Sequence, residues 1–320
     1  MLKIKIGTRA SKLALAQVEE IKNFLLTNKL ASEEQIQIIH FTTSGDRIQD
    51  RNLSEIGGKG LFIKELEEAL IHNKIDVAIH SAKDIPPFLH KDTEIAAFSK
   101  RFDARDCFIS KKFNSINELP QGSVVGTSSA RRKAILLGLR PDLKVVNFRG
   151  NVDTRLKKIE NDEVDATILA ICGLTRLRER KEQNSACPLG YDEINKIIEK
   201  DVMLPAGGQG ALAIQVRKND KNIFDIVNKI NDFESEVCLR AERSFLSELG
   251  ASCSTPVAVH AWKENNLLHL KTIILDYDGS ESFVTKNEGN FTVDSAIKMG
   301  IEAANQNKNK ATKLLQKICN

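Results

Sequence analysis

The sequence predicts an α/β protein made of two similar lobes that flank a cleft, followed by a small C-terminal α+β domain with an antiparallel sheet. Three observations lead to this prediction. Strand-like and helix-like segments alternate over residues 1–99 and again over 107–175. The letters of the second stretch repeat those of the first. From about residue 233 the pattern changes to helix, three strands and helix.

The first stretch contains four strand-like runs with two amphipathic segments among them. Apolar residues recur at helical spacing from Ala14 to Leu25, and again within 60–72. The predicted strands are residues 3–7, 36–42, 76–80 and 94–99.

The second stretch follows the same plan. Its predicted strands are 123–126, 143–148 and 166–170, and its predicted helices are 130–137 and 152–159. The repeat pairs IGTRAS (6–11) with VGTSSA (125–130), KIDVAIHS (74–81) with EVDATILA (163–170), and TTSGD (42–46) with FRGNVDTR (148–155). Each pair places a polar loop after a strand, where α/β proteins usually bind ligands. We therefore expect a ligand cleft between the lobes.

The rest of the chain completes the predicted domains. Residues 179–203 are polar and irregular, typical of a variable loop with a short helix, and 204–216 form a glycine-rich loop that leads into a buried strand. The predicted C-terminal elements are a helix over 237–249, strands over 256–262, 267–276 and 281–286, and a helix over 294–317. The predicted domains are 1–99 with 211–230, then 100–210, then 231–320.

Composition excludes several classes of protein. The chain has 320 residues, 41% of them hydrophobic, and a net charge of +4, which is typical of a folded globular protein. No apolar run approaches the roughly 20 residues of a membrane span, and the N-terminus lacks the apolar core of a secretory signal. Basic residues are spread along the chain, with aromatics at 5%, so we expect no nucleic-acid partner. A cytoplasmic protein without a membrane partner is expected.

Standard catalytic motifs are missing from the sequence. It holds no complete P-loop, no G-x-G-x-x-G after a strand, no G-x-S-x-G and no H-E-x-x-H. None of the six cysteines forms a C-x-x-C pair or has a histidine at metal-ligand spacing, so no metal is expected. Cys253 lies among small residues in LGASCSTPVA and is the thiol we expect to be accessible; the alternative is a buried structural thiol, as expected of Cys172.

Loops rich in Arg, Lys, Ser and Thr follow several predicted strands. They are 8–11, 57–60, 81–84, 127–129, 131–132, 149–151 and Arg155. Helix N-termini and arginines both attract anions, so the set predicts a polyanionic small-molecule ligand. A serine at a helix start can also be only a cap. The adjacent pair Lys83 and Asp84 is either a surface ion pair or a carboxylate held among cations, where it could stabilise a cationic intermediate.

The same segments carry a resemblance that runs through essentially the whole chain. They are IGTRASKLALAQ, TSGD, GGKGLFIKELEEAL, DVAIHSAKDIP, DARDCFIS, VGTSSARRKA, FRGNVDTRL, ICGLTRL, LPAGGQGALAI and GASCSTP. In this combination the chain resembles the porphobilinogen deaminase (hydroxymethylbilane synthase) family of tetrapyrrole biosynthesis. The resemblance implies two periplasmic-binding-protein-like lobes and a third domain that carries the cofactor on a loop.

The resemblance also implies a reaction and its cofactor. Four porphobilinogen molecules are joined head to tail, each with loss of ammonia, to give hydroxymethylbilane. The cofactor is a dipyrromethane attached through a thioether to a loop cysteine, here Cys253. A cytoplasmic monomer that acts on a small-molecule substrate is implied as well.

The resemblance assigns a role to each matching residue. Asp84 matches the catalytic aspartate. The positions that match cofactor-binding residues are Cys253, Lys83, Asp46, Thr127, Ser128, Ser129, Arg131, Arg132 and Gly150. The positions that match substrate-binding residues are Arg9, Ser11, Lys59, Phe62, Arg149, Arg155, Arg176 and Gln209. Glu55, Ser44 and Ala251 depart from residues common in the family.

Two other functions stay open on the residues alone. A non-catalytic binding protein with the same two lobes would need neither Cys253 nor Asp84. A nucleic-acid-binding protein would use the arginines for phosphates, with binding that falls steeply as salt rises.

Overall fold

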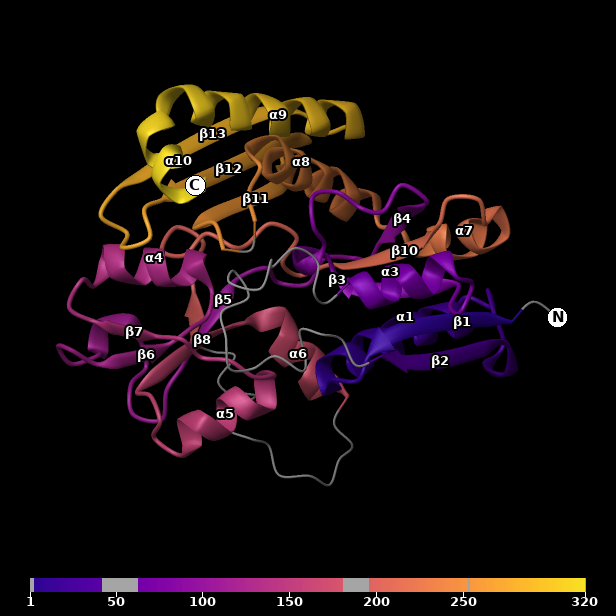
Figure 1. Ribbon diagram of the computed structural model, residues 1–320, viewed down its shortest axis with the longest axis horizontal. Coiled ribbons are helices and arrows are strands. Elements are labelled where there is room, and N and C mark those ends of the chain that lie inside the picture. Colours follow the sequence, from indigo (N-terminus) through magenta and orange to yellow (C-terminus); the bar gives the residue numbers. More distant parts are fainter. Residues whose placement is uncertain (1–2, 42–62, 181–195, 253, 320) are drawn as a thin grey trace. The chain divides into compact units, whose positions relative to one another are not determined.

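The structure is a computed structural model that describes residues 3–41, 63–180, 196–252 and 254–319 (Figure 1). The chain forms two compact units. Unit 1 comprises Met1–Phe102 with Ala211–Glu236, and unit 2 comprises Asp103–Gly210 with Val237–Asn320. Within the described ranges, no helix has both the length and the apolar character that a membrane crossing requires.

Unit 1 contains a five-stranded sheet in the order β2-β1-β3-β10-β4. The strands are β1 (Ile4–Arg9), β2 (Ile36–Phe41), β3 (Val77–Ser81), β4 (Thr93–Phe98) and β10 (Leu212–Arg217). The helices are α1 (Lys12–Thr27), α3 (Lys64–Ile71) and α7 (Lys221–Val227), with 3-10 turns η1 (Glu33–Gln35), η3 (Ala82–Asp84) and η6 (Asn228–Ile230). β1 runs parallel to β2 and β3, whereas β10 runs antiparallel to β3 and β4.

Helix α1 shows why these segments fold as they do. Its first turn is capped by Ser11, whose Oγ accepts a hydrogen bond from the backbone N of Ala14 at 3.3 Å. Val18, Ile21 and Leu25 follow at helical spacing and are buried in the core of the sheet. Burying each such side chain contributes about 1.5–3 kcal/mol, which exceeds what helix propensity alone supplies.

Unit 2 contains a second five-stranded sheet, in the order β7-β6-β8-β5-β9. Its strands are β5 (Asp106–Ile109), β6 (Val124–Gly126), β7 (Lys144–Val146), β8 (Ala166–Ala170) and β9 (Ile197–Ile198). Its helices are α4 (Ala130–Leu139), α5 (Val152–Glu160) and α6 (Ile171–Glu179), with the 3-10 turn η4 (Ile116–Glu118). β6 is parallel to β7 and β8, and β5 is antiparallel to β8 and β9. The strand plan is that of unit 1, so the prediction of two similar α/β lobes is confirmed.

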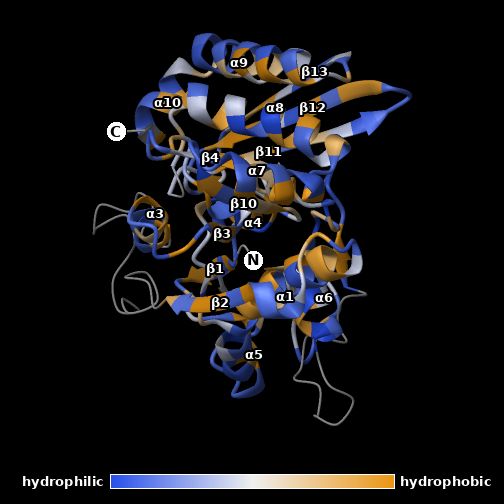
Figure 2. Ribbon diagram, turned by 90° about the vertical axis from the view of Figure 1, so that its right-hand side faces the viewer, coloured by the Kyte–Doolittle hydropathy of each residue, from blue (hydrophilic) through white to orange (hydrophobic). Residues whose placement is uncertain are grey.

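The C-terminal part of unit 2 forms a three-stranded antiparallel sheet, as predicted. Its elements are α8 (Phe233–Leu249), whose first turn belongs to unit 1, and then β11 (Val257–Glu264), β12 (Leu267–Leu275), β13 (Ser282–Asn290), α9 (Val293–Lys310) and α10 (Thr312–Cys319). Phe245 of α8, Leu268 of β12 and Met299 of α9 share one apolar core. Figure 1 shows α9 lying along this sheet, and in Figure 2 hydrophilic and hydrophobic bands alternate along the helix.

Several predicted boundaries differ from the structure for local reasons. The predicted helix over 294–317 is two helices, because the Thr312 hydroxyl bonds the carbonyl of Lys308 at 2.7 Å and competes for the acceptor of an unbroken helix. The predicted strand over 143–148 ends at Val146, since the N–H of Phe148 binds the Ser128 hydroxyl at 3.1 Å instead of a strand. Strands β5 and β9 were not predicted. The structure does not test the predicted domain boundaries, which stay a prediction.

Candidate functional site

In unit 1, the predicted site residues Arg9, Lys83 and Asp84 follow neighbouring strands. β1 and β3 pair in parallel, with Ile6 opposite Val77, so their carboxyl ends lie at the same edge of the sheet. Arg9 ends β1 and is half-buried. Lys83 and Asp84 lie in η3 directly after β3; Lys83 is half-buried and Asp84 is exposed.

The backbone around Asp84 is held on both sides of the turn. Ala82 is buried, and its N–H binds the carbonyl of Ala211 on the neighbouring strand segment at 3.0 Å. The N–H of Ile85 closes the 3-10 turn on the carbonyl of Ala82 at 3.4 Å, and Pro86 follows. The turn thus presents the Asp84 carboxylate to solvent from a fixed backbone.

A buried histidine beneath this edge was not among the predicted site residues. His80 on β3 is buried, and its Nε2 lies 2.9 Å from Oε1 of Gln215. The amide of Gln215 donates to Glu67 at 2.7 Å and to Thr93 at 2.9 Å, so Oε1 is left to accept from a neutral imidazole. Burial is the main reason that the pKa of His80 is lowered to about 4. The hydrogen bond to Gln215 raises this pKa, and the charge of Arg9 lowers it. A polar residue ending the apolar run DVAIH was the signal in the sequence.

In unit 2, the residues Thr127, Ser128 and Ser129 shape the loop between β6 and α4. The N–H of Thr127 binds the carbonyl of Val146 at 2.9 Å, which continues the pairing of β6 with β7. Ser128 bonds the side chain of Asn147. Ser129 caps α4, because its Oγ accepts from the N–H of Arg132 at 3.3 Å. The capping role considered for such serines therefore exists at Ser129, as it does at Ser11.

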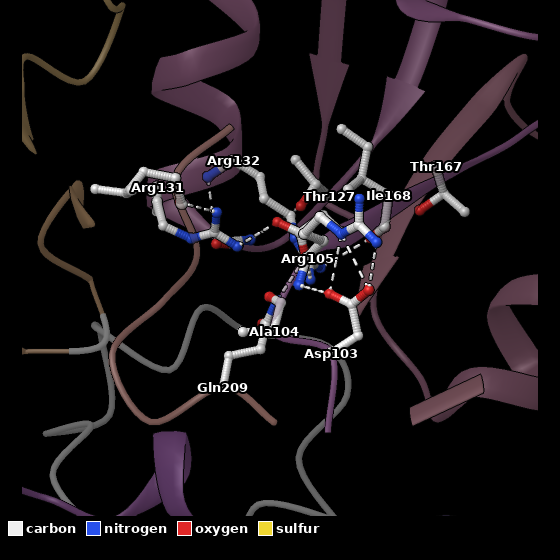
Figure 3. Close-up of polar contacts among 12 residues, drawn as sticks. Asp103, Ala104, Arg105, Thr127, Arg131, Arg132, Thr167, Ile168 and Gln209 are labelled. Carbon is white, nitrogen blue, oxygen red and sulfur yellow. Dashed lines mark hydrogen bonds and ion pairs between the residues drawn. The ribbon is translucent and has the colours of Figure 1, made fainter. Parts of the chain in front are cut away.

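Arg131 and Arg132 are buried residues, with exposed fractions of 4% and 6%. Figure 3 shows their side chains as sticks. Arg131 donates through Nη1 to the carbonyl of Leu204 at 2.7 Å and through Nη2 to Asp106 at 2.8 Å. Arg132 donates through Nη1 to the carbonyl of Ile168 at 2.8 Å and through Nη2 to Asp106 at 2.7 Å. Within the described part of the chain, the Nε of each is buried without a hydrogen-bond partner.

Sequence reasoning missed the carboxylate that joins these arginines. Asp106 begins β5 and is fully buried. Burial raises the pKa of its carboxyl, but the charges and hydrogen bonds of Arg131 and Arg132 outweigh burial, so the pKa lies well below its usual range. Gln209, predicted to bind substrate, is buried and donates to Asp106 at 2.9 Å and to the carbonyl of Ala104 at 2.6 Å. An acidic residue opening the apolar run DCFI was the available signal.

Further arginines extend this positive region. The Nε of Arg155 donates to the carbonyl of Gly150 at 2.9 Å, and Gly150 adopts a φ of +116°, which favours glycine. Burial first, and then the charges of Arg132 and Arg149, lower the pKa of Arg155 to about 10. Arg176 on α6 is buried and donates to the carbonyl of Gly210 at 3.1 Å.

This region fits a ligand that carries several carboxylates. The charges of Arg132 and Arg149 add to burial in lowering the pKa of Arg155. The buried Nε groups of Arg131 and Arg132 are donors that a ligand could still use. Adding anionic groups would relieve the repulsion and supply acceptors. The role of these arginines in binding a ligand stays a prediction.

Four predicted site residues lie outside the described residues: Asp46, Lys59, Phe62 and Cys253. Beside Cys253, the hydroxyls of Ser252 and Ser254 lie 2.8 Å apart. Among the residues that the structure does describe, no group of three or more side chains is arranged to hold a metal ion.

Solved structures with a similar course of the chain share little sequence with it. An ABC transporter, periplasmic substrate-binding protein from Coxiella burnetii is 15% identical, covers 71% of this chain and 91% of its own, and has a TM-score of 0.39. A nutrient binding protein from Burkholderia cenocepacia bound to methionine is 16% identical, covers 71% and 90%, and also has a TM-score of 0.39.

Comparison by sequence is far more specific. Residues 4–225 match the family model "Porphobilinogen deaminase, dipyromethane cofactor binding domain", and residues 236–309 match "Porphobilinogen deaminase, C-terminal domain". The porphobilinogen deaminase of Nitrobacter hamburgensis is 47% identical over 96% of this chain and 93% of its own. That of Paracoccus denitrificans is 44% identical over 89% and 88%. The chain therefore belongs to the porphobilinogen deaminase family.

Proposed function

We propose that the protein is a transferase that joins four porphobilinogen molecules head to tail with loss of one ammonia each, and that water, which supplies the hydroxyl group, then releases the product hydroxymethylbilane. The growing chain is held on a dipyrromethane attached through a thioether to Cys253. The observation that carries the proposal is the buried arginine cluster of unit 2, in which Asp106 offsets only part of the positive charge. Membership of the family supplies the reaction.

The arginines bind the carboxylates of the substrate and of its products. Each porphobilinogen carries an acetate and a propionate group, so every added unit brings two more negative charges. Arg131, Arg132 and Arg155 can each donate charge-assisted hydrogen bonds to such groups, worth about 1.5–3 kcal/mol apiece. Thr127 and Ser129 line the loop that leads to the arginine pair and would hold the dipyrromethane with it.

Asp84 acts on the reacting centre. The protonated amino group of the aminomethyl substituent leaves as ammonia and takes the electrons of the C–N bond with it, so the methylene that remains on the pyrrole is a cation. The exposed carboxylate of Asp84 accepts a hydrogen bond from a pyrrole N–H and stabilises this positive charge. After the new carbon–carbon bond forms, the same carboxylate is placed to accept the proton released from the ring carbon.

The dipyrromethane, when bound, supplies the pyrrole carbon to which the first unit is joined. Cys253 provides its attachment, which keeps the end of the chain near one set of protein groups. Lys83, half-buried next to Asp84, offers an ammonium group to a carboxylate on the same edge of the unit 1 sheet.

The proposal includes a cytoplasmic monomer that binds porphobilinogen and no nucleic acid. Its support is the family resemblance and the spread of basic residues along the chain. Light scattering of the purified protein would test the monomer, and a dimer mass would contradict it. Retention on a DNA column that falls steeply with salt would contradict the absence of nucleic-acid binding.

The intact mass of the purified protein, measured beside a Cys253→Ser variant, tests the central claim. We expect the wild type to carry an added mass of about two porphobilinogen units less ammonia, and the variant to carry none. Unmodified wild type would next be incubated with porphobilinogen. If folded wild type gained no mass even then, the transferase would be refuted in favour of a two-lobed anion-binding protein.

A further inference from the structure

The two arginines of unit 2 meet at a single carboxylate. Each oxygen of Asp106 holds one of them: Oδ2 accepts from Nη2 of Arg131 at 2.8 Å, and Oδ1 accepts from Nη2 of Arg132 at 2.7 Å. The Asp106 side chain has no exposed surface. One carboxylate therefore pairs with two guanidinium groups, and the three side chains together keep one net positive charge.

Backbone carbonyls fix the other arm of each guanidinium. Nη1 of Arg131 donates to Leu204, and Nη1 of Arg132 donates to Ile168. Because both Nη groups of a planar guanidinium are held, the direction of its Nε–H is set as well. Each Nε is buried and, within the described ranges, has no hydrogen-bond partner. The protein itself thus fixes the donors before any ligand arrives.

Asp106 is in turn held from the C-terminal part of unit 2. Gln209 donates to its Oδ1 at 2.9 Å. The N–H of the preceding residue, Gly208, donates to Glu242 of α8 at 2.7 Å, and the same carboxylate accepts from Ala261 of β11 at 2.7 Å. Glu242 is fully buried. These hydrogen bonds, joined by the peptide bond between Gly208 and Gln209, connect the C-terminal sheet to the arginine pair.

We propose that Asp106 is a positioning residue for carboxylate recognition: it holds Arg131 and Arg132 so that their remaining N–H groups bind the carboxylates of the tethered pyrrole chain. This inference rests on the function proposed above. Without the shared anion, two adjacent guanidinium groups repel each other and lose their common orientation. A misplacement of about 1 Å at such a site can reduce a rate by roughly 100-fold.

Three variants separate positioning from stability. Asp106→Asn keeps the shape, but its NH₂ group opposes one guanidinium. Asp106→Glu keeps the charge and moves it by one methylene. Asp76→Asn is the matched control, because Asp76 pairs with Arg217 at 2.9 Å and accepts from the N–H of Lys5 at 2.9 Å in the other unit. For each we would measure thermal unfolding, and the rate at which unloaded protein gains the dipyrromethane mass from porphobilinogen.

We expect Asp106→Asn to load roughly 10- to 100-fold more slowly than the wild type, while Asp76→Asn loads at the wild-type rate despite its own loss of stability. Equal loading by Asp106→Asn and Asp76→Asn would overturn the positioning role. If Asp106→Asn does not fold, Asp106→Glu decides: slower loading supports the role, and wild-type loading overturns it. If folded wild type never gained the mass, the proposed function would be refuted, and this inference with it. If the wild type loads normally, the proposed function stands, and the loading rates of the Asp106 variants test the positioning role alone.

Discussion

In each five-stranded sheet a single strand, β10 or β5, runs antiparallel to the other four, and in both a serine caps the helix that follows the second strand in the sheet order. The antiparallel strand beside the parallel set supplies each sheet with a buried polar side chain. In unit 1 this is Gln215 of β10, which hydrogen-bonds His80, a histidine whose burial keeps it neutral. In unit 2 it is Asp106 of β5, which holds two charged arginines.

One backbone plan thus serves two electrostatic tasks. In unit 1, β10 carries a neutral amide, and the edge of the sheet holds an exposed carboxylate, Asp84, and a half-buried cation, Lys83. A carboxylate on β5 allows buried guanidinium groups to stay charged in unit 2. In the proposed function, unit 1 carries out the chemistry at a cationic centre and unit 2 recognises carboxylates.

We expect the largest effect from a change at Asp84 of unit 1, the residue that the proposed function places at the reacting centre. Asp84→Asn keeps the side-chain shape but removes the negative charge, so we expect kcat to fall by about 10²- to 10⁴-fold. The dipyrromethane mass and the thermal stability should stay near wild type, because Asp84 is exposed. Steady-state kinetics with intact mass on the same sample would measure both.

An exposed carboxylate elsewhere in the same unit provides the control. Asp92→Asn removes a similar charge near His90 and should leave kcat within about twofold, the scale of a surface contact. Wild-type turnover by Asp84→Asn would end the division of tasks between the units.

The buried histidine predicts a pH dependence that belongs to unit 1. The pKa of His80 is lowered to about 4 in the folded protein, against about 6.5 when unfolded. Between these values the unfolded chain binds the extra proton, so the free energy of unfolding rises with pH and reaches its full value above about 6.5. Lowering the pH from 7 to 5 should therefore cost about 2 kcal/mol.

Unit 2 should respond at lower pH. The pKa of Asp106 is lowered on folding, so its contribution is present above the unfolded value of about 3.9 and is lost as pH falls through the folded one. Hydrogen exchange at pH 7 and 5 would compare β3 and β10 with β5 and β8. We expect the amides of β3 and β10 in unit 1 to lose protection from exchange between pH 7 and 5. In the His80→Gln variant this loss should be much smaller. An equal loss in both sheets would contradict the assignment to His80.

The sequence predicted the two-lobed plan because strands and helices alternate with clear periods and because the repeat is visible in the letters 6–11 and 125–130. It also predicted that the loops holding Arg131, Arg132 and Arg155 converge, because they follow predicted strands. It could not predict Asp106 or His80. Their partners lie 25 and 135 residues away in the chain, and it is the tertiary fold, with β5 beside β8 and β10 beside β3, that brings them together.

The smallest effect concerns two equivalent glycines, Gly7 of β1 and Gly126 of β6, which occupy the same position of the repeat. A Cβ at Gly7 would lie 2.4 Å from Cδ1 of Ile75, the flexible end of a side chain that can turn away. A Cβ at Gly126 would meet Cγ and Cβ of Phe148 at 2.5 and 2.9 Å, and these atoms cannot move without the ring and its backbone. We therefore expect Gly126→Ala to lower the free energy of unfolding by about 1–3 kcal/mol, and Gly7→Ala by about 1 kcal/mol less.

Chemical denaturation of the two variants would measure this difference. Phe148 precedes Arg149 and Gly150, so Gly126→Ala should also disturb the loop that holds Arg155 and slow loading of the dipyrromethane. Gly7→Ala should leave loading unchanged, because its neighbours Ile75 and Leu66 belong to the apolar core beneath α3. If Gly7→Ala were the more destabilising change, the unit 2 loop would adjust to an added methyl group more easily than the unit 1 core does. The arginine region would then be less rigid than we infer from its hydrogen bonds.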